Sequence, residues 1–102
     1  MQIKYNAKAR RHIGSTIDYY LSHYGKQATL NLAHEIDEKV KTLQKYPGIG
    51  FIEPLLTGRS IRYRATIIGQ YHKLIYYVKG DIIRIAAFWD MRMSPENLRK
   101  RI

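Results

Sequence analysis

Three short runs of β-branched and aromatic residues follow one another in the second half of the chain, and they restrict the possible fold more than any other feature. The runs are Ile61–Ile68, Tyr71–Val78 and Ile82–Trp89. Gly69-Gln70 separates the first two runs and Lys79-Gly80-Asp81 separates the last two, which is typical of tight turns. The sequence therefore predicts three consecutive antiparallel strands, a β-meander.

The same stretch carries an unusual charge balance. Residues 54–80 contain five Lys or Arg residues and no Asp or Glu. Side chains alternate between the two faces of a strand, so the first run separates its apolar and polar residues. The apolar face holds Ile61, Tyr63, Ala65 and Ile67, and the polar face holds Arg62, Arg64 and Thr66. We therefore predict that one face of the meander is core and the other is a basic surface that binds an anion.

The first half of the chain predicts a short strand and two helices. Met1–Asn6 alternates apolar and polar residues, as an edge strand does, and Asn6 suits the N-cap of a helix that begins at Ala7. Gly25 ends this helix, and a second helix follows over Lys26–Tyr46. Apolar residues at spacings of three and four give each helix a stripe for burial. The stripes are Ile13, Ile17, Tyr20, Leu21 and Tyr24, then Leu32, Ala33, Ile36, Val40 and Leu43.

These elements define an expected fold. Helices joined by so short a link run antiparallel, the stretch from Pro47 to Gly58 is rich in glycine and proline and predicts a loop, and Ser94-Pro95-Glu96 predicts a short final helix. We expect one α+β domain over residues 1–102, with a two-helix antiparallel hairpin packed on a four-stranded antiparallel sheet. Its order is β-α-α-β-β-β followed by the short C-terminal helix.

Composition limits the classes of function. The chain has 102 residues, 18 Lys or Arg against 8 Asp or Glu, a formal net charge of +10 and no cysteine. It has no apolar run near the roughly 18 residues that span a bilayer and no apolar signal core, so we expect a cytoplasmic protein. The charge favours a nucleic-acid or acidic-protein partner, and a simply solvated basic surface is the alternative.

No metal or nucleophile motif is visible. The four histidines are scattered, there is no cysteine, and no phosphate loop or triad pattern is present, so we expect neither metal nor cofactor. What remains is cationic and phenolic, since arginines bind phosphates and aromatic rings stack on unpaired bases. Such groups could cleave RNA through its own 2′-hydroxyl by aligning it and neutralising the phosphorane, with Lys or Tyr moving protons. The alternatives are that the tyrosines pack in the core and that Arg84 is a cross-strand surface residue.

Several short motifs carry a resemblance to a known family. They are the Ala9-Arg10-Arg11 segment of the first helix, YPGIG after the second, the R-Y-R strand, GQYHKLIYYV with its KGD turn, and the closing FWDMR-x-x-P. Together they resemble the RelE/ParE toxin superfamily, the toxins of bacterial type II toxin-antitoxin systems, often described as plasmid stabilisation proteins. The similarity runs from Met1 to Leu98.

The resemblance implies an acidic antitoxin as partner and one of two targets. RelE-like toxins cleave mRNA in the ribosomal A site as metal-independent mRNA interferases, whereas ParE-like toxins inhibit DNA gyrase without cleaving nucleic acid. For the first activity we predict catalytic roles for Lys73, Arg92 and Arg64. The predicted RNA-binding residues are Arg62, Arg59, Tyr71, Tyr77 and Arg84. The C-terminal SPENLRKRI lacks the tyrosine that such enzymes often carry. An inactive relative that binds only antitoxin or nucleic acid is a third possibility.

Overall fold

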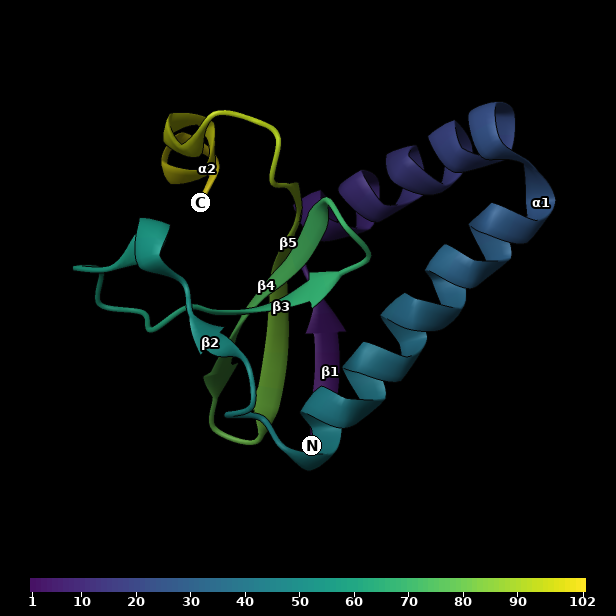
Figure 1. Ribbon diagram of the computed structural model, residues 1–102. Coiled ribbons are helices and arrows are strands. Elements are labelled where there is room, and N and C mark those ends of the chain that lie inside the picture. The colour runs from purple at the N-terminus through teal and green to yellow at the C-terminus, as the bar shows by residue number, and fades with distance from the viewer.

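The computed structural model describes all 102 residues, and it confirms the α+β class. Figure 1 shows a central sheet with the long helix α1 on one side and the short helix α2 on the other. The elements are β1 (Gln2–Tyr5), α1 (Ala7–Lys45), β2 (Phe51–Ile52), the 3-10 helix η1 (Pro54–Leu56), β3 (Arg64–Ile68), β4 (His72–Lys79), β5 (Ile82–Asp90) and α2 (Pro95–Arg101). No helix is both long enough and apolar enough to cross a membrane.

The sheet is mixed and has five strands, in the order β1-β5-β4-β3-β2. The predicted meander is present, but the prediction of a four-stranded antiparallel sheet is wrong in two respects. Strand β1 lies parallel to β5, with Gln2 opposite Ile82. The predicted loop contains β2, which pairs with β3 through Phe51 and Ala65. Both features depend on contacts between residues far apart in the sequence, which local patterns do not specify.

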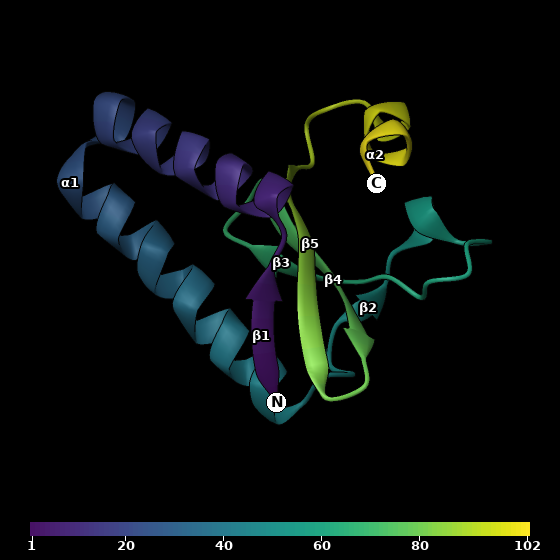
Figure 2. The ribbon, with the colours of Figure 1, turned by 180° about the vertical axis from the view of Figure 1, so that it is seen from behind.

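Helix α1 consists of two arms that meet at Gly25. Asn6 caps the first arm, because its side chain accepts a hydrogen bond of 2.8 Å from the backbone N–H of Ala9. Gly25 has φ 85° and ψ 179°, a conformation that L side chains rarely adopt, and the chain reverses direction there. Figures 1 and 2 show the arms as a V whose apex points away from the sheet. The predicted pair of helices with a break at Gly25 is therefore confirmed.

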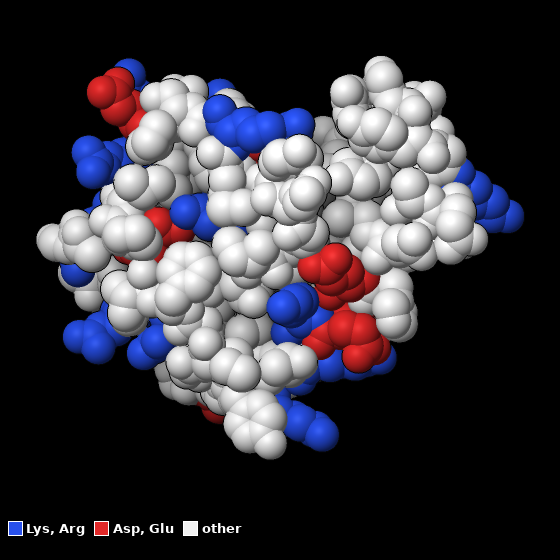
Figure 3. All heavy atoms as spheres, in the orientation of Figure 1, with Lys and Arg blue, Asp and Glu red and all other residues white.

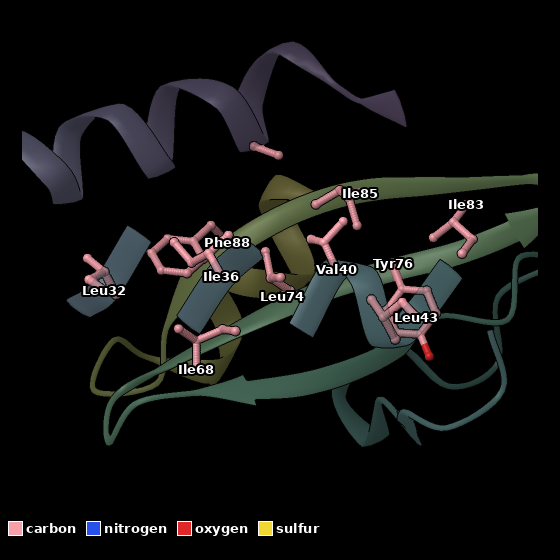
Figure 4. Close-up of a cluster of buried hydrophobic side chains, with 11 residues drawn as sticks. Leu32, Ile36, Val40, Leu43, Ile68, Leu74, Tyr76, Ile83, Ile85 and Phe88 are labelled. Atoms are coloured by element: carbon pink, nitrogen blue, oxygen red, sulfur yellow. The ribbon is translucent and has the colours of Figure 1, made fainter. Parts of the chain in front are cut away.

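Because both arms leave the sheet as they approach Gly25, side chains near the apex of the V are less buried than those near the sheet. The second arm packs Leu32, Ile36, Val40 and Leu43 against the sheet, as predicted (Figure 4). The fifth residue of the predicted stripe, Ala33, is exposed. The predicted stripe of the first arm is only partly buried, and near the tip Leu21 is 55% and Tyr24 is 57% exposed. These residues lie where the arm has already left the sheet.

Both faces of the sheet carry core. The first cluster lies between α1 and the sheet and includes Leu74, Tyr76 and Ile85. The second lies on the opposite face, against η1 and α2, and consists of Leu56, Ala65, Ile75, Ala87, Trp89 and Leu98. Leu74, Ile75 and Tyr76 are consecutive and fully buried, as expected for a central strand that is covered on both sides. The prediction that one face of the meander is an open basic surface is therefore wrong over much of the sheet.

Candidate functional site

A hollow adjoins the second core cluster beside β2. We call it the sheet hollow, and it has a volume of about 340 Å³. Its lining includes Glu53, Leu56, Thr57, Arg59, Arg62 and Tyr63. The loop after α1 supplies Glu53, and the segment before β3 supplies the two arginines. Of the predicted RNA-binding residues, Arg59 and Arg62 meet here.

Glu53, which lines the sheet hollow, belongs to a buried ion pair. The Nζ atom of Lys73 on β4 contacts Glu53 Oε1, and the two side chains are 9% and 0% exposed. The other carboxylate oxygen of Glu53 accepts a hydrogen bond of 3.1 Å from the backbone N–H of Leu55. A buried charge is tolerated in a protein core only when it is paired in this way. The structure therefore places the predicted catalytic residue Lys73 beside a carboxylate.

Sequence reasoning missed Glu53, although the sequence contains a signal for it. Glu53 is the only acidic residue between Glu38 and Asp81, in a stretch with many basic residues. A single carboxylate in such a stretch is a candidate for pairing with one of the cations. Which cation it pairs with depends on how the loop after α1 packs on β4.

The arginines of the sheet hollow differ in their availability. Arg59 donates hydrogen bonds to the backbone carbonyl oxygens of Arg99 at 2.7 Å and Ile102 at 2.5 Å, so it attaches the C-terminal helix. Arg62 is exposed and makes neither an ion pair nor a hydrogen bond within the chain. Arg62 is therefore the cation of the hollow that is free to contact a ligand.

A strip of aromatic and basic residues continues along the same sheet face. The rings of Tyr63 and Tyr77 meet edge to face with centroids 5.6 Å apart. Arg84 on β5 lies opposite Tyr77 and beside Lys4 of β1 in the ladder. The alternation along β4 places Lys73 and Tyr77 on one face, and Arg84 shares that face because it pairs with Tyr77, so this face carries three of the predicted residues. Arg62 precedes β3, outside the ladder, and lines the sheet hollow.

Arg64 lies on the opposite face, which corrects the prediction that it shares a surface with Lys73. It pairs with Tyr76 in the ladder, and its Nη1 donates to the carbonyl oxygens of Gly48 at 3.2 Å and Gly50 at 2.8 Å. The Tyr76 hydroxyl donates to the Pro47 carbonyl at 2.7 Å and accepts from the Gly50 N–H at 3.0 Å. Burial raises the pKa of Tyr76. Arg64 and Tyr76 thus fix the loop after α1.

The length of one turn explains this separation. A two-residue turn at Gly69-Gln70 would place Ile68 opposite Tyr71, and Lys73 would then share a face with Arg64. In the structure Ile68 pairs with His72 and Ile67 pairs with Lys73, because three residues connect the strands. The extra residue moves Lys73 to the other face.

Arg92 and Tyr71 lie in a second depression, at the end of the sheet beside the first arm of α1. We call it the end groove: two cavities of about 560 Å³ and 160 Å³ that share Ser15, Thr16, His72 and Asp90. The Nε and Nη2 atoms of Arg92 donate to Asp90 at 3.0 and 2.8 Å, and its guanidinium carbon lies 4.3 Å from the centre of the Tyr71 ring.

The charges of Arg92 and Asp90 in the end groove therefore balance each other. The hydrogen bond from Arg92 is the main reason that the pKa of Asp90 lies below its usual range. Burial lowers the pKa of His72, which keeps its imidazole neutral at pH 7. Arg92, Arg64 and Lys73, the predicted catalytic set, thus occupy three separate places. In the view of Figure 3, Lys and Arg atoms are spread around the molecule with acidic atoms between them, and no single basic patch dominates.

Comparisons with known proteins identify the fold. No protein-family model matches the sequence, and no curated protein matches it. Among solved structures, a chain of the chromosomal ParDE TA system from P. aeruginosa superposes with a TM-score of 0.70 and 24% identity, over 88% of this chain and 95% of that chain. The YoeB dimer from Staphylococcus aureus gives a TM-score of 0.59 and 22% identity, over 86% of this chain and 93% of that chain.

A third structure, the YoeB-YefM complex from Staphylococcus aureus, gives a TM-score of 0.55 and 19% identity, over 86% of this chain and 93% of that chain. At these identities the likeness establishes a common fold. The chain therefore shares the fold of these ParDE and YoeB chains, in agreement with the fold that the sequence motifs predicted.

Proposed function

We propose that this chain is the toxin of a type II toxin-antitoxin system. The fold shared with chains of the ParDE system and of YoeB supports this assignment, as does the motif resemblance from Met1 to Leu98. The formal net charge of +10 fits an acidic antitoxin as partner. The YoeB-YefM complex, which pairs a chain of the same fold with a second protein, also supports a protein partner.

As its activity we propose metal-independent cleavage of mRNA at the ribosome, with the sheet hollow as the active site. The Glu53–Lys73 pair beside the free Arg62 carries this proposal. A carboxylate can accept a proton, an ammonium group can donate one, and a free guanidinium can bind phosphate oxygens. Transfer of the phosphoryl group to the 2′-hydroxyl of RNA requires these three kinds of group.

The steps follow from these roles. Glu53 accepts the proton of the 2′-hydroxyl as its oxygen attacks the phosphorus atom. Arg62 stabilises the negative charge of the phosphorane, and Lys73 donates a proton to the 5′-oxygen as the P–O5′ bond breaks. The products are a 2′,3′-cyclic phosphate and a 5′-hydroxyl. Lys73 is thereby the proton donor. It replaces the tyrosine that RelE-like enzymes often carry in the C-terminal helix and that this chain lacks. Because both groups of the pair are buried, RNA reaches them only when the hollow opens.

The alternative is a ParE-like inhibitor of DNA gyrase that cleaves nothing. Two observations favour it. The ParDE chain has a higher TM-score than the YoeB chains, and all three predicted catalytic cations already have partners within the chain.

One pair of assays separates the two activities. The purified chain is added to translating ribosomes, and primer extension maps new mRNA 5′ ends; in parallel, purified gyrase is assayed for DNA supercoiling. We expect codon-centred cleavage by the native chain and about 100- to 1,000-fold slower cleavage by Arg62→Ala, which removes one charge from the transition state. Lys26→Ala, an exposed change at the tip of α1, is the control. Intact mRNA together with inhibited supercoiling would establish the gyrase alternative.

A further inference from the structure

The end groove has aromatic walls that no neighbouring element covers. On the α1 side, the Tyr19 and Tyr20 rings each meet the Tyr24 ring edge to face, with centroids 5.8 and 5.0 Å apart. On the sheet side, the guanidinium carbon of Arg92 lies over the Tyr71 ring, 4.3 Å from its centre, which is a cation-π contact. Tyr24 and Tyr71 are 57% and 44% exposed. Two aromatic surfaces therefore face a space of about 560 Å³.

The floor of the end groove offers neutral hydrogen-bonding groups. His72 makes no hydrogen bond within the chain, and its ring is stacked on Phe88 with centroids 4.8 Å apart and planes 4° from parallel. The neutral imidazole has one donor nitrogen and one acceptor nitrogen. In the smaller cavity the Nδ1 atom of His12 is buried and has no partner. A ligand that reaches this floor can form hydrogen bonds with the histidine nitrogens and can stack on the aromatic rings.

Cations lie at the far end of the groove, where the first arm of α1 meets α2. Arg101 lines the smaller cavity and lies 5.8 Å from the ring centre of Trp89. The Nζ atom of Lys8 donates a hydrogen bond of 2.9 Å to the backbone carbonyl oxygen of Arg101, which places a second cation close to this end. By contrast, the one acidic residue of the groove, Asp90, is neutralised by Arg92.

This combination fits one class of ligand. An unpaired nucleobase has two ring faces that stack and an edge that forms hydrogen bonds, and the phosphates on either side of it are anionic. An acidic peptide would match the cations but would leave the aromatic walls and the neutral floor unused. The end groove shares no lining residue with the sheet hollow.

We propose that the end groove binds one unpaired base of a single-stranded RNA, stacked on the Tyr71–Arg92 pair and bonded to His72, with a flanking phosphate at Arg101. This site is separate from the proposed active site, and it does not require that the chain cleaves RNA. If cleavage does occur, the groove holds a part of the strand outside the scissile bond.

Binding of an uncleavable strand tests the proposal without ribosomes. The probe is a fluorescein-labelled 2′-O-methyl RNA hexamer, which has no free 2′-hydroxyl, titrated with the full chain and followed by anisotropy. A second hexamer has abasic sugars in its four central positions. We expect roughly 5- to 100-fold weaker binding of the abasic strand, and a similar loss when Tyr71→Ala or Tyr24→Ala binds the normal strand. Tyr46→Ala, at a 62% exposed residue after α1, is the matched control and is expected to leave binding unchanged.

A second variant separates edge recognition from folding. His72→Phe keeps a flat ring that can stack on Phe88 but lacks both nitrogens, so we expect weaker binding of the normal strand and unchanged binding of the abasic one. Two-dimensional NMR of the native chain with the hexamer should show contacts between base protons and the rings of Tyr24 and Tyr71. Equal affinity for the two strands, or equal effects of Tyr24→Ala and Tyr46→Ala, would overturn the proposal. The proposal would also be overturned if the NMR signals of end-groove residues shifted on addition of an acidic peptide and not on addition of RNA.

Discussion

Removing the ammonium group from the buried ion pair should destabilise the fold strongly. Lys73→Met keeps a long unbranched side chain and deletes only the charge. Glu53 then remains buried with a single hydrogen bond, from the Leu55 N–H. Breaking a buried pair by removing one partner costs about 3–5 kcal/mol, because the remaining charge is uncompensated. For a domain of this size each kcal/mol lowers Tm by about 4–8 °C, so a loss of about 3 kcal/mol corresponds to roughly 12–24 °C.

Urea unfolding followed by circular dichroism measures this loss, and two further variants interpret it. Glu53→Gln combined with Lys73→Met removes both charges, so the double variant should be more stable than Lys73→Met alone. Lys41→Met is the matched control: Lys41 contacts Asp37 at 3.0 Å, but their side chains are 62% and 59% exposed, so the urea midpoint should barely change. The reasoning is refuted if Lys73→Met loses less than about 1 kcal/mol, or if the double variant is no more stable than it.

Three further predictions follow from other contacts. Burial lowers the pKa of His72 in the folded state, so the unfolded chain takes up the proton first and the free energy of unfolding should fall as pH drops below about 6.5. His72→Gln should therefore bring the urea midpoints at pH 7.5 and pH 5.5 closer together. The control His23→Gln should leave the difference between these midpoints unchanged. Gly50→Ala should lose about 1–3 kcal/mol in urea unfolding, because the added carbon would lie 2.5 Å from the Tyr76 hydroxyl, whereas Gly48→Ala has open space and should be tolerated. Arg59→Ala removes the hydrogen bonds to the Arg99 and Ile102 carbonyls, so amide exchange in α2 should speed up while that in β4 stays unchanged; equal acceleration in both would contradict this attachment.

Local sequence signals were sufficient for much of the fold. The helical hairpin follows from two apolar stripes and from Gly25, and the meander follows from runs of β-formers with glycine between them. Each of these signals lies within the element that it specifies. The parallel pairing of β1 with β5 is different, because the direction of β1 is set by a partner about 80 residues away in the sequence. Nothing within Gln2–Tyr5 encodes that direction.

The candidate site was harder to predict than the fold. The sequence predicted roles for Lys73 and Arg62; in the structure Arg62 lines the sheet hollow and Lys73 contacts Glu53, another lining residue. The sequence could not show that Arg64 and Lys73 lie on opposite faces of the sheet, since a difference of one residue in the turn between β3 and β4 decides this. The partner of Lys73 was also hidden, because Glu53 is 20 positions away and reaches it only through the packing of the loop after α1.

The three-residue link between β3 and β4 makes the chain intolerant of a change in length there. Deleting one of Gly69, Gln70 or Tyr71 would exchange the two sides of one strand relative to the other, turning Lys73 toward α1 and Leu74 away from it. Insertions and deletions are therefore expected to be absent from this link in homologues of the chain. Connections that do not join two paired strands are free of this constraint on register.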